Sequence, residues 1–114
     1  MESLEVAHKI IEVASDKQAT DIVLLDVRGL CSFADYFVIC SGESERQLRT
    51  IQEETEHTLK KMGILAHHAE GTPGSGWILL DFGDIIVHIF SAFERQFYQL
   101  DEFWRGAVPL VRIQ

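Results

Sequence analysis

The sequence predicts an α/β domain built on a mixed sheet of about five strands with helices packed on it. A strand-helix-strand pattern leads up to Glu70, and a hairpin and a last helix follow. The hairpin spans residues 76–90, where two apolar runs flank Gly83-Asp84, a pair suited to a two-residue turn. A chain of 114 residues suits one core, and we expect one domain over residues 1–106 and a tail over 107–114.

The two faces of the predicted hairpin differ in character, because strand side chains point alternately to opposite faces of a sheet. With Phe82 and Ile85 flanking the turn, one face is wholly apolar and must be core: Ile78, Leu80, Phe82, Ile85, Val87 and Ile89. The other, here called the mixed face, comprises Trp77, Leu79, Asp81, Ile86, His88 and Phe90. Either a helix covers the mixed face, and Asp81 and His88 then need buried partners, or the face is exposed and marks an interaction site. The register is an assumption, since a slip by one residue exchanges the faces.

Two helices are predicted before the hairpin. The first covers residues 3–18, with Ser3 as candidate N-cap and apolar residues at helical spacing. The second follows Ser44, which forms a capping-box pattern with Gln47, and ends at Gly63. Its inward stripe comprises Leu48, Ile51, Thr55, Leu59 and Met62.

Three more strands are predicted, at residues 21–27, 36–40 and 64–70. The first two are near-continuous apolar runs, which is typical of strands buried on both faces. The segment 71–76 is rich in Gly and Pro, and we expect a mobile loop without regular structure there.

The chain after the hairpin is expected to form a helix. Ser91 caps a short helical turn, and residues 95–104 continue as a C-terminal helix. Its apolar stripe comprises Phe97, Leu100 and either Trp104 or Phe103. The segment from Val108 to Ile113 is either an extended edge segment or disordered.

The charge of the chain favours a protein partner over nucleic acid. Its 10 Lys and Arg and 18 Asp and Glu give a formal net charge of −8. Direct nucleic-acid binding normally requires a basic patch, and only Arg46, Arg49 and Lys60-Lys61 form local exceptions. An acidic surface suits a basic protein better. We therefore expect no direct DNA binding.

A cytoplasmic protein is expected. No run approaches the roughly 20 apolar residues of a membrane helix, and the N-terminus lacks the features of a secretory signal. Cys31 and Cys40 lie in apolar surroundings and are interpreted as small buried hydrophobic residues in a reducing compartment.

The residues offer no complete catalytic, cofactor or metal site. His67 and His68 are adjacent on a predicted strand and point to opposite faces, so they cannot readily share a metal. Ser41-Gly42 precedes a capped helix, as in nucleotidyltransferase folds that bind phosphate there. Those enzymes also need two carboxylates on the next strand to hold Mg²⁺, and here only Glu70 is present, with His68 in the alternate position. We expect no enzymatic activity and no cofactor.

Several blocks of residues together suggest a family. They are Asp21-Ile22 to Asp26-Val27; Ala34 to Gly42 with Ser44, Arg46 and Gln47; Glu70-Gly71; Trp77 to Asp81; Gly83-Asp84; Val87 to Phe90; and Arg95, Tyr98, Leu100 and Trp104. In this order and spacing they resemble the Iojap-like ribosomal silencing factor family over nearly the whole chain.

The resemblance implies a non-catalytic translation repressor. Such factors bind the large ribosomal subunit through the ribosomal protein that is fourteenth in its series, at the face that meets the small subunit, and so block subunit joining. The resemblance also implies a nucleotidyltransferase-like fold without the catalytic carboxylates, and a homodimer when the factor is free.

We expect the mixed face to contact the ribosomal protein. The candidate partner-binding residues are Trp77, Leu79, Asp81, Ile86 and His88. Trp77 is the expected aromatic anchor, and Asp81 is expected to meet a basic group of the partner. Two alternatives stay open: a degenerate nucleotide-binding protein, and a homodimeric scaffold module whose mixed face pairs with itself.

Overall fold

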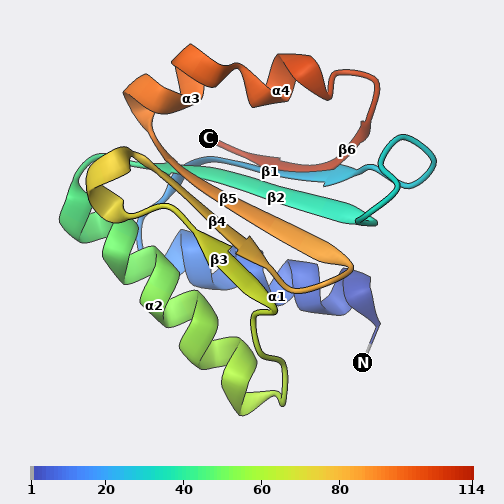
Figure 1. The fold of residues 1–114 in the computed structure, drawn as a ribbon, viewed down its shortest axis with the longest axis horizontal. Coiled ribbons are helices and arrows are strands. Elements are labelled where there is room, and N and C mark those ends of the chain that lie inside the picture. Colours follow the sequence, from blue (N-terminus) through green and yellow to red (C-terminus); the bar gives the residue numbers. More distant parts are fainter. Residues whose placement is uncertain (1) are drawn as a thin grey trace.

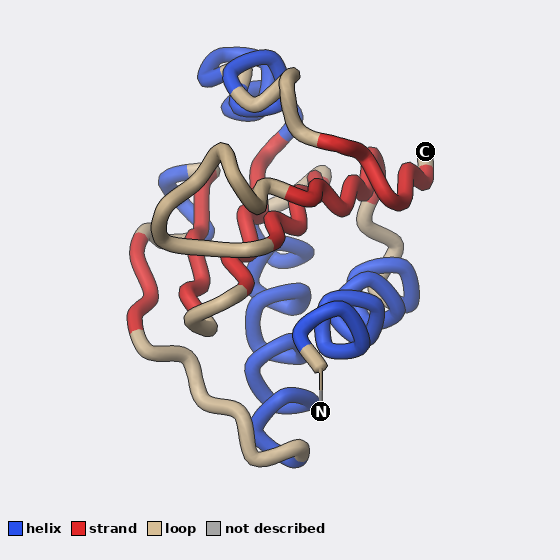
Figure 2. The backbone as a smooth tube through the Cα atoms, turned by 90° about the vertical axis from the view of Figure 1, so that its right-hand side faces the viewer, coloured by secondary structure: helices blue, strands red, loops and turns tan. Residues whose placement is uncertain are grey.

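A six-stranded mixed sheet forms the centre of the molecule in the computed structural model, which describes residues 2–114 apart from the side chains of Asp101 and Phe103. The strands are β1 (Thr20–Asp26), β2 (Tyr36–Gly42), β3 (His68–Glu70), β4 (Trp77–Asp81), β5 (Ile85–Ser91) and β6 (Val108–Ile113). The helices are α1 (Ser3–Asp16), α2 (Glu45–Lys61), α3 (Ala92–Tyr98) and α4 (Leu100–Phe103). Helices α1 and α2 lie on one face of the sheet, and α3 and α4 lie on the other (Figure 1, Figure 2).

The order of strands is β3-β4-β5-β2-β1-β6. Strand β2 runs parallel to β5, and the other neighbouring pairs are antiparallel, so the predicted α/β class and mixed sheet are confirmed. The sheet has six strands rather than about five, because residues 108–113 pair with β1 as an edge strand.

The predicted register of the hairpin is confirmed. Asp81 pairs with Ile86 and Trp77 with Phe90, and the backbone N–H of Phe82 donates to the carbonyl of Ile85 at 2.9 Å. Gly83 has a φ of 93°, a left-handed conformation that Gly adopts without steric cost.

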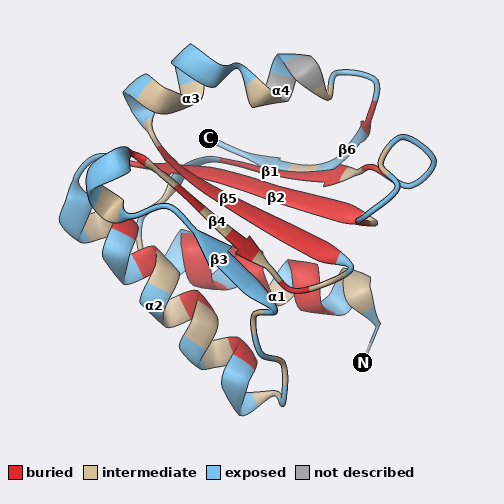
Figure 3. Ribbon diagram, in the orientation of Figure 1, coloured by how far each residue is buried: buried red, intermediate tan, exposed pale blue. Residues whose placement is uncertain are grey.

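The core lies in two layers, one on each side of the sheet (Figure 3). The larger layer packs α1 and α2 against the apolar hairpin face, and all six residues of that face are buried. The smaller layer packs residues such as Phe37, Ile86 and Phe90 near Leu100 and Trp104 of the C-terminal segment. Because strands β1, β2 and β5 lie between the two layers, most of their side chains are buried on both faces.

Two of the predicted helix caps are present and one is wrong. The hydroxyl oxygens of Ser44 and Ser91 accept hydrogen bonds from backbone N–H groups at the starts of α2 and α3. Ser3, in contrast, already lies in the first turn of α1, and its hydroxyl donates to Asp84 at 3.0 Å. The N-cap of α1 is Glu2, which makes no side-chain capping bond.

The segment 71–76 contains regular structure, which corrects the expectation of a loop without it. Pro73–Ser75 form a 3₁₀ turn, η1. The side chains of Thr72 and Ser75 each accept a hydrogen bond from the other's backbone N–H, at 3.2 Å. This reciprocal capping stabilises a short turn despite the Gly and Pro around it. Strand β3 is also shorter than predicted, since only His68–Glu70 pair with β4.

The expected C-terminal helix is divided in two. Gln99 has a φ of 50°, which ends α3 and separates it from α4. Phe97 was expected on the inward stripe, but the break changes which side chains face the sheet, and Phe97 is 67% exposed. Leu100 and Trp104 pack on the sheet as predicted, and the alternative Phe103 lies outside the described side chains.

Both cysteines are free: Cys40 is buried, and Cys31 is half-buried. Burial raises the pKa of the Cys40 thiol to about 12. Among residues 2–114, we find no helix with the length and apolar character needed to cross a membrane.

We predict that Gly71→Ala destabilises the fold more than Gly63→Ala. Both glycines have positive φ, at 84° and 83°, so each substitution costs about 1 kcal/mol of backbone strain. A Cβ at Gly71 would also overlap the carbonyl oxygen of Trp77, whereas a Cβ at Gly63 would meet open space. The Gly71 variant should therefore lose about 3 kcal/mol in urea unfolding. Equal losses in both variants would contradict the close approach of Gly71 to β4.

Candidate functional site

The mixed face lies on the side of the sheet that carries α3 and α4 (Figure 1). Ile86, His88 and Phe90 on β5 are buried, whereas Trp77, Leu79 and Asp81 on β4 are half-buried. The two alternatives left open by the sequence, a covered face and an exposed face, are therefore both realised in part. The short C-terminal helices lie over β5 and leave the side chains of β4 on this face half-exposed.

Trp77 is held in place by contacts within the chain. Its indole N–H donates to Nδ1 of His88 at 3.2 Å. Its ring stacks on that of Phe90, with 5.0 Å between centroids, and lies 4.5 Å from the ring of Tyr98. The indole thus supplies a partner for Nδ1 of the buried imidazole, and the acceptor role requires this nitrogen to be unprotonated.

Asp81 combines a structural bond with a position at the surface. Its Oδ1 accepts a hydrogen bond from the backbone N–H of Gly83 at 2.8 Å, which supports the hairpin turn. In the sheet it pairs with His68 of β3, so their side chains lie on the same face.

A hollow of about 260 Å³, here called the inner recess, opens on the mixed face. It is lined by Phe33, Phe37, His68, Glu70, Leu79, Asp81, Ile86, His88, Leu100 and Trp104. Trp104 packs edge-on against Phe37, with 5.0 Å between centroids. The inner recess therefore has an apolar floor, with carboxylates from β3 and β4 among its lining groups.

A second hollow of about 270 Å³, here called the outer recess, adjoins the first at Glu70 and Leu79. Its other lining residues are Gly71, Ser75, Trp77 and Tyr98. Together the two recesses follow β4 from the end near α3 to the end near the hairpin turn. Apolar hollows flanked by charged groups are typical of protein-binding surfaces.

The structure brings all five predicted site residues together on one face. Leu79, Asp81, Ile86 and His88 line the inner recess, and Trp77 lines the outer one. The buried positions of Ile86 and His88 make them part of the floor rather than of the rim.

Several lining residues were not predicted from the sequence. Phe33 comes from the loop between β1 and β2, Glu70 from β3, and Tyr98 from the end of α3. A large aromatic residue such as Phe33 in the segment before a buried strand was a local sequence signal for a surface role, and its side chain is 65% exposed.

The Ser41-Gly42 corner is occupied by the chain's own groups. Ser41 is buried, and its hydroxyl accepts a hydrogen bond from the guanidinium of Arg95 at 3.0 Å. Across the sheet, the ring of His68 lies 2.8 Å from the carboxylate of Glu70. Within the described part of the chain, no group of three His, Cys, Asp or Glu side chains could hold a metal ion.

Comparison with known proteins shows the family of this chain. The family model described as "Ribosomal silencing factor during starvation" matches residues 1–114. A protein of Halalkalibacterium halodurans named "Ribosomal silencing factor RsfS" is 34% identical over 114 residues, which covers 100% of this chain and 97% of that protein. The Bacillus subtilis protein of the same name is 41% identical over 95 residues, covering 83% of this chain and 80% of that protein.

A plant protein and a solved structure are also similar. "Protein Iojap, chloroplastic" of Zea mays is 37% identical over 109 residues, covering 96% of this chain and 47% of that protein. A crystal structure of a Chromobacterium violaceum protein superposes with a TM-score of 0.89 at 30% identity, covering 96% of this chain and 91% of that one. The fold and these matches agree, and the chain belongs to the RsfS family of ribosomal silencing factors.

Proposed function

We propose that this chain is a translation repressor that binds the large ribosomal subunit and sterically prevents the small subunit from joining. The names of its relatives support a ribosomal partner. The observation that carries the docking site is the half-open mixed face, where Trp77, Leu79 and Asp81 reach the surface above an apolar floor. A surface of this kind binds a polypeptide without requiring any reactive group.

The proposed partner is the ribosomal protein fourteenth in the series of the large subunit. Ribosomal proteins that contact RNA carry many basic groups, and the formal charge of −8 on this chain steers such a partner towards it. Glu70 and Asp81 would meet basic side chains, while Trp77 and Leu79 would bury apolar surface. The mechanism is steric, so it needs no catalysis, cofactor or nucleotide, and it acts in the cytoplasm.

We predict that the purified chain sediments with isolated large subunits and not with small subunits or joined ribosomes. The reason is that the intersubunit face is open only on the free large subunit. Sucrose-cushion sedimentation of the three particles, each with the same molar amount of the chain, measures this directly. Equal recovery with joined ribosomes would refute the proposed blocking of subunit joining.

The mixed face is tested by Leu79→Ala and Asp81→Asn. Leu79→Ala removes apolar contact from both recesses and should weaken large-subunit binding by about 1–2 kcal/mol. Asp81→Asn keeps an acceptor oxygen for the N–H of Gly83 and removes the charge, with an expected loss of about 1 kcal/mol in binding.

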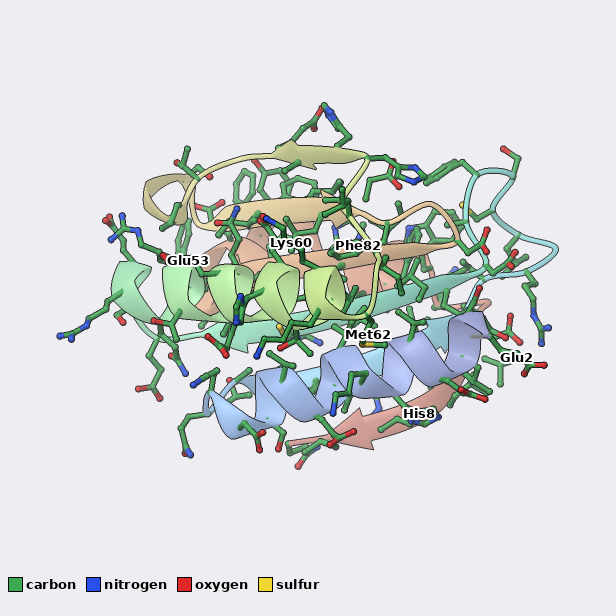
Figure 4. All side chains as sticks on the ribbon, turned by 90° about the horizontal axis from the view of Figure 1, so that it is seen from below. Glu2, His8, Glu53, Lys60, Met62 and Phe82 are labelled. Carbon is green, nitrogen blue, oxygen red and sulfur yellow. The ribbon has the colours of Figure 1, made fainter. Side chains whose placement is uncertain are left out.

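Matched controls exist elsewhere on the chain. Leu65, 63% exposed in the loop before β3, lines neither recess, so Leu65→Ala should leave binding unchanged. Glu53 projects from α2 on the opposite side of the sheet, where Figure 4 shows it, and Glu53→Gln removes one negative charge there. If the control variants lose as much affinity as the mixed-face variants, the partner docks elsewhere.

We also propose that the free chain is a homodimer and that it pairs through α3 rather than through the mixed face. Phe93 and Phe97 are 72% and 67% exposed, and their rings stack with 6.3 Å between centroids. The exposed residues of α3 carry no formal charge, whereas the whole chain has a charge of −8. Two copies therefore meet with least repulsion at this helix, and an aromatic pair is self-complementary across a two-fold axis.

The double variant Phe93→Ser, Phe97→Ser should be monomeric in light scattering and should bind large subunits like the parent. Phe33→Ser is the converse control, because Phe33 is 65% exposed and lines the inner recess. It should weaken subunit binding and leave the dimer intact. A dimer that persists in the double variant, or that dissociates in the Phe33 variant, would place the contact away from α3.

A further inference from the structure

The outer recess has the composition of a site for an organic cation. Trp77 and Tyr98 contribute two rings whose centroids are 4.5 Å apart, and Glu70 contributes a carboxylate. Aromatic rings attract cations through their quadrupole, and a carboxylate attracts them through its charge. The volume of about 270 Å³ is several times the roughly 30 Å³ that one water molecule occupies in the liquid, so a planar guanidinium group fits.

The walls of this recess are held in position before any partner arrives. Glu70 pairs with Leu79 in the sheet, and Trp77 lies two residues before Leu79 on β4, so the three side chains share one face. The indole is oriented by its hydrogen bond to His88 and its stacking on Phe90. A site that is already ordered loses little conformational entropy when it binds.

Glu70 is the group that gives the recess its charge. In the free chain its Oε1 lies 2.8 Å from Nε2 of His68, and both side chains are exposed. An incoming cation can bind the carboxylate of Glu70 together with His68, or it can displace His68 from the carboxylate. Because surface pairs of this kind contribute little to stability, exchanging His68 for a partner's group costs little.

We propose that the outer recess receives an arginine side chain of the protein partner, an inference that rests on the proposed function. Arginine suits the recess better than lysine, because its flat guanidinium stacks on aromatic rings and forms two parallel hydrogen bonds with a carboxylate. Tyr98 and Glu70 are then recognition residues beside the five predicted from the hairpin. The docking segment of the partner therefore places apolar side chains in the inner recess and an arginine side chain in the outer recess.

The recess is tested without the ribosome by titrating the isotope-labelled chain with N-acetyl-L-argininamide and following NMR shifts. We expect saturable shifts of the Trp77 indole N–H and of the amides near Glu70, and none with N-acetyl-L-leucinamide. Glu70→Gln should weaken the arginine compound by about tenfold, while Glu53→Gln on α2 should not. Equal responses to the two compounds, or unchanged binding in the Glu70 variant, would overturn the proposal.

The link to the partner is tested by sedimentation with large subunits. Tyr98→Leu removes the ring and should lower the affinity about fivefold, whereas Tyr98→Phe keeps the ring and should not. Urea unfolding checks that both variants are equally stable. If Glu70→Gln and Tyr98→Leu bind large subunits like the parent, the partner's arginine does not enter this recess, and the proposed function still stands. If the parent itself does not sediment with large subunits, the proposed function fails, and the NMR titration alone decides what the recess binds.

Discussion

The register of the β4–β5 hairpin, which pairs Asp81 with Ile86, is the constraint on which the rest of the structure depends. One row of its side chains is apolar throughout and faces α1 and α2, while the other row carries Asp81 and His88 towards α3 and α4. A slip by one residue would place both polar groups in the larger core layer. Burying an unpaired polar group costs about 1–3 kcal/mol, and more when it is charged, so the register is strongly specified.

The surface that follows from this register is incomplete because the elements available to cover it are short. Helix α3 has seven residues and helix α4 has four, so they cover only part of the mixed face and leave the two recesses. Trp77 stays half-buried beside Tyr98 of α3, oriented by His88 and Phe90. An aromatic residue that is fixed in the free protein and still reaches the surface is well suited to anchor an interface, since binding need not order it.

Charge and apolar surface are distributed differently over the two sides of the C-terminal segment. The mixed face combines its apolar floor with the carboxylates of Glu70 and Asp81, which favours a basic partner. The outer side of α3 presents Phe93 and Phe97 without exposed charge, which favours a second copy of the same acidic chain. The two surfaces adjoin at Tyr98, which lines the outer recess and whose ring lies 5.1 Å from that of Phe97.

Local pattern alone determined much of this protein: the hairpin and its register, both faces of the hairpin, and the helix starts at Ser44 and Ser91. These features depend on side-chain alternation and on capping bonds between residues close in sequence. Only the tertiary structure decided that β6 pairs with β1, that Gln99 divides the last helix, and that Tyr98 rather than Phe97 lies beside Trp77. It also decided that Phe33 and Glu70 join the site. The strand pairing, the aromatic contact and the lining of the recesses all join segments that are far apart in the chain. Neither segment encodes such a contact by itself, because the contact depends on how the whole chain packs.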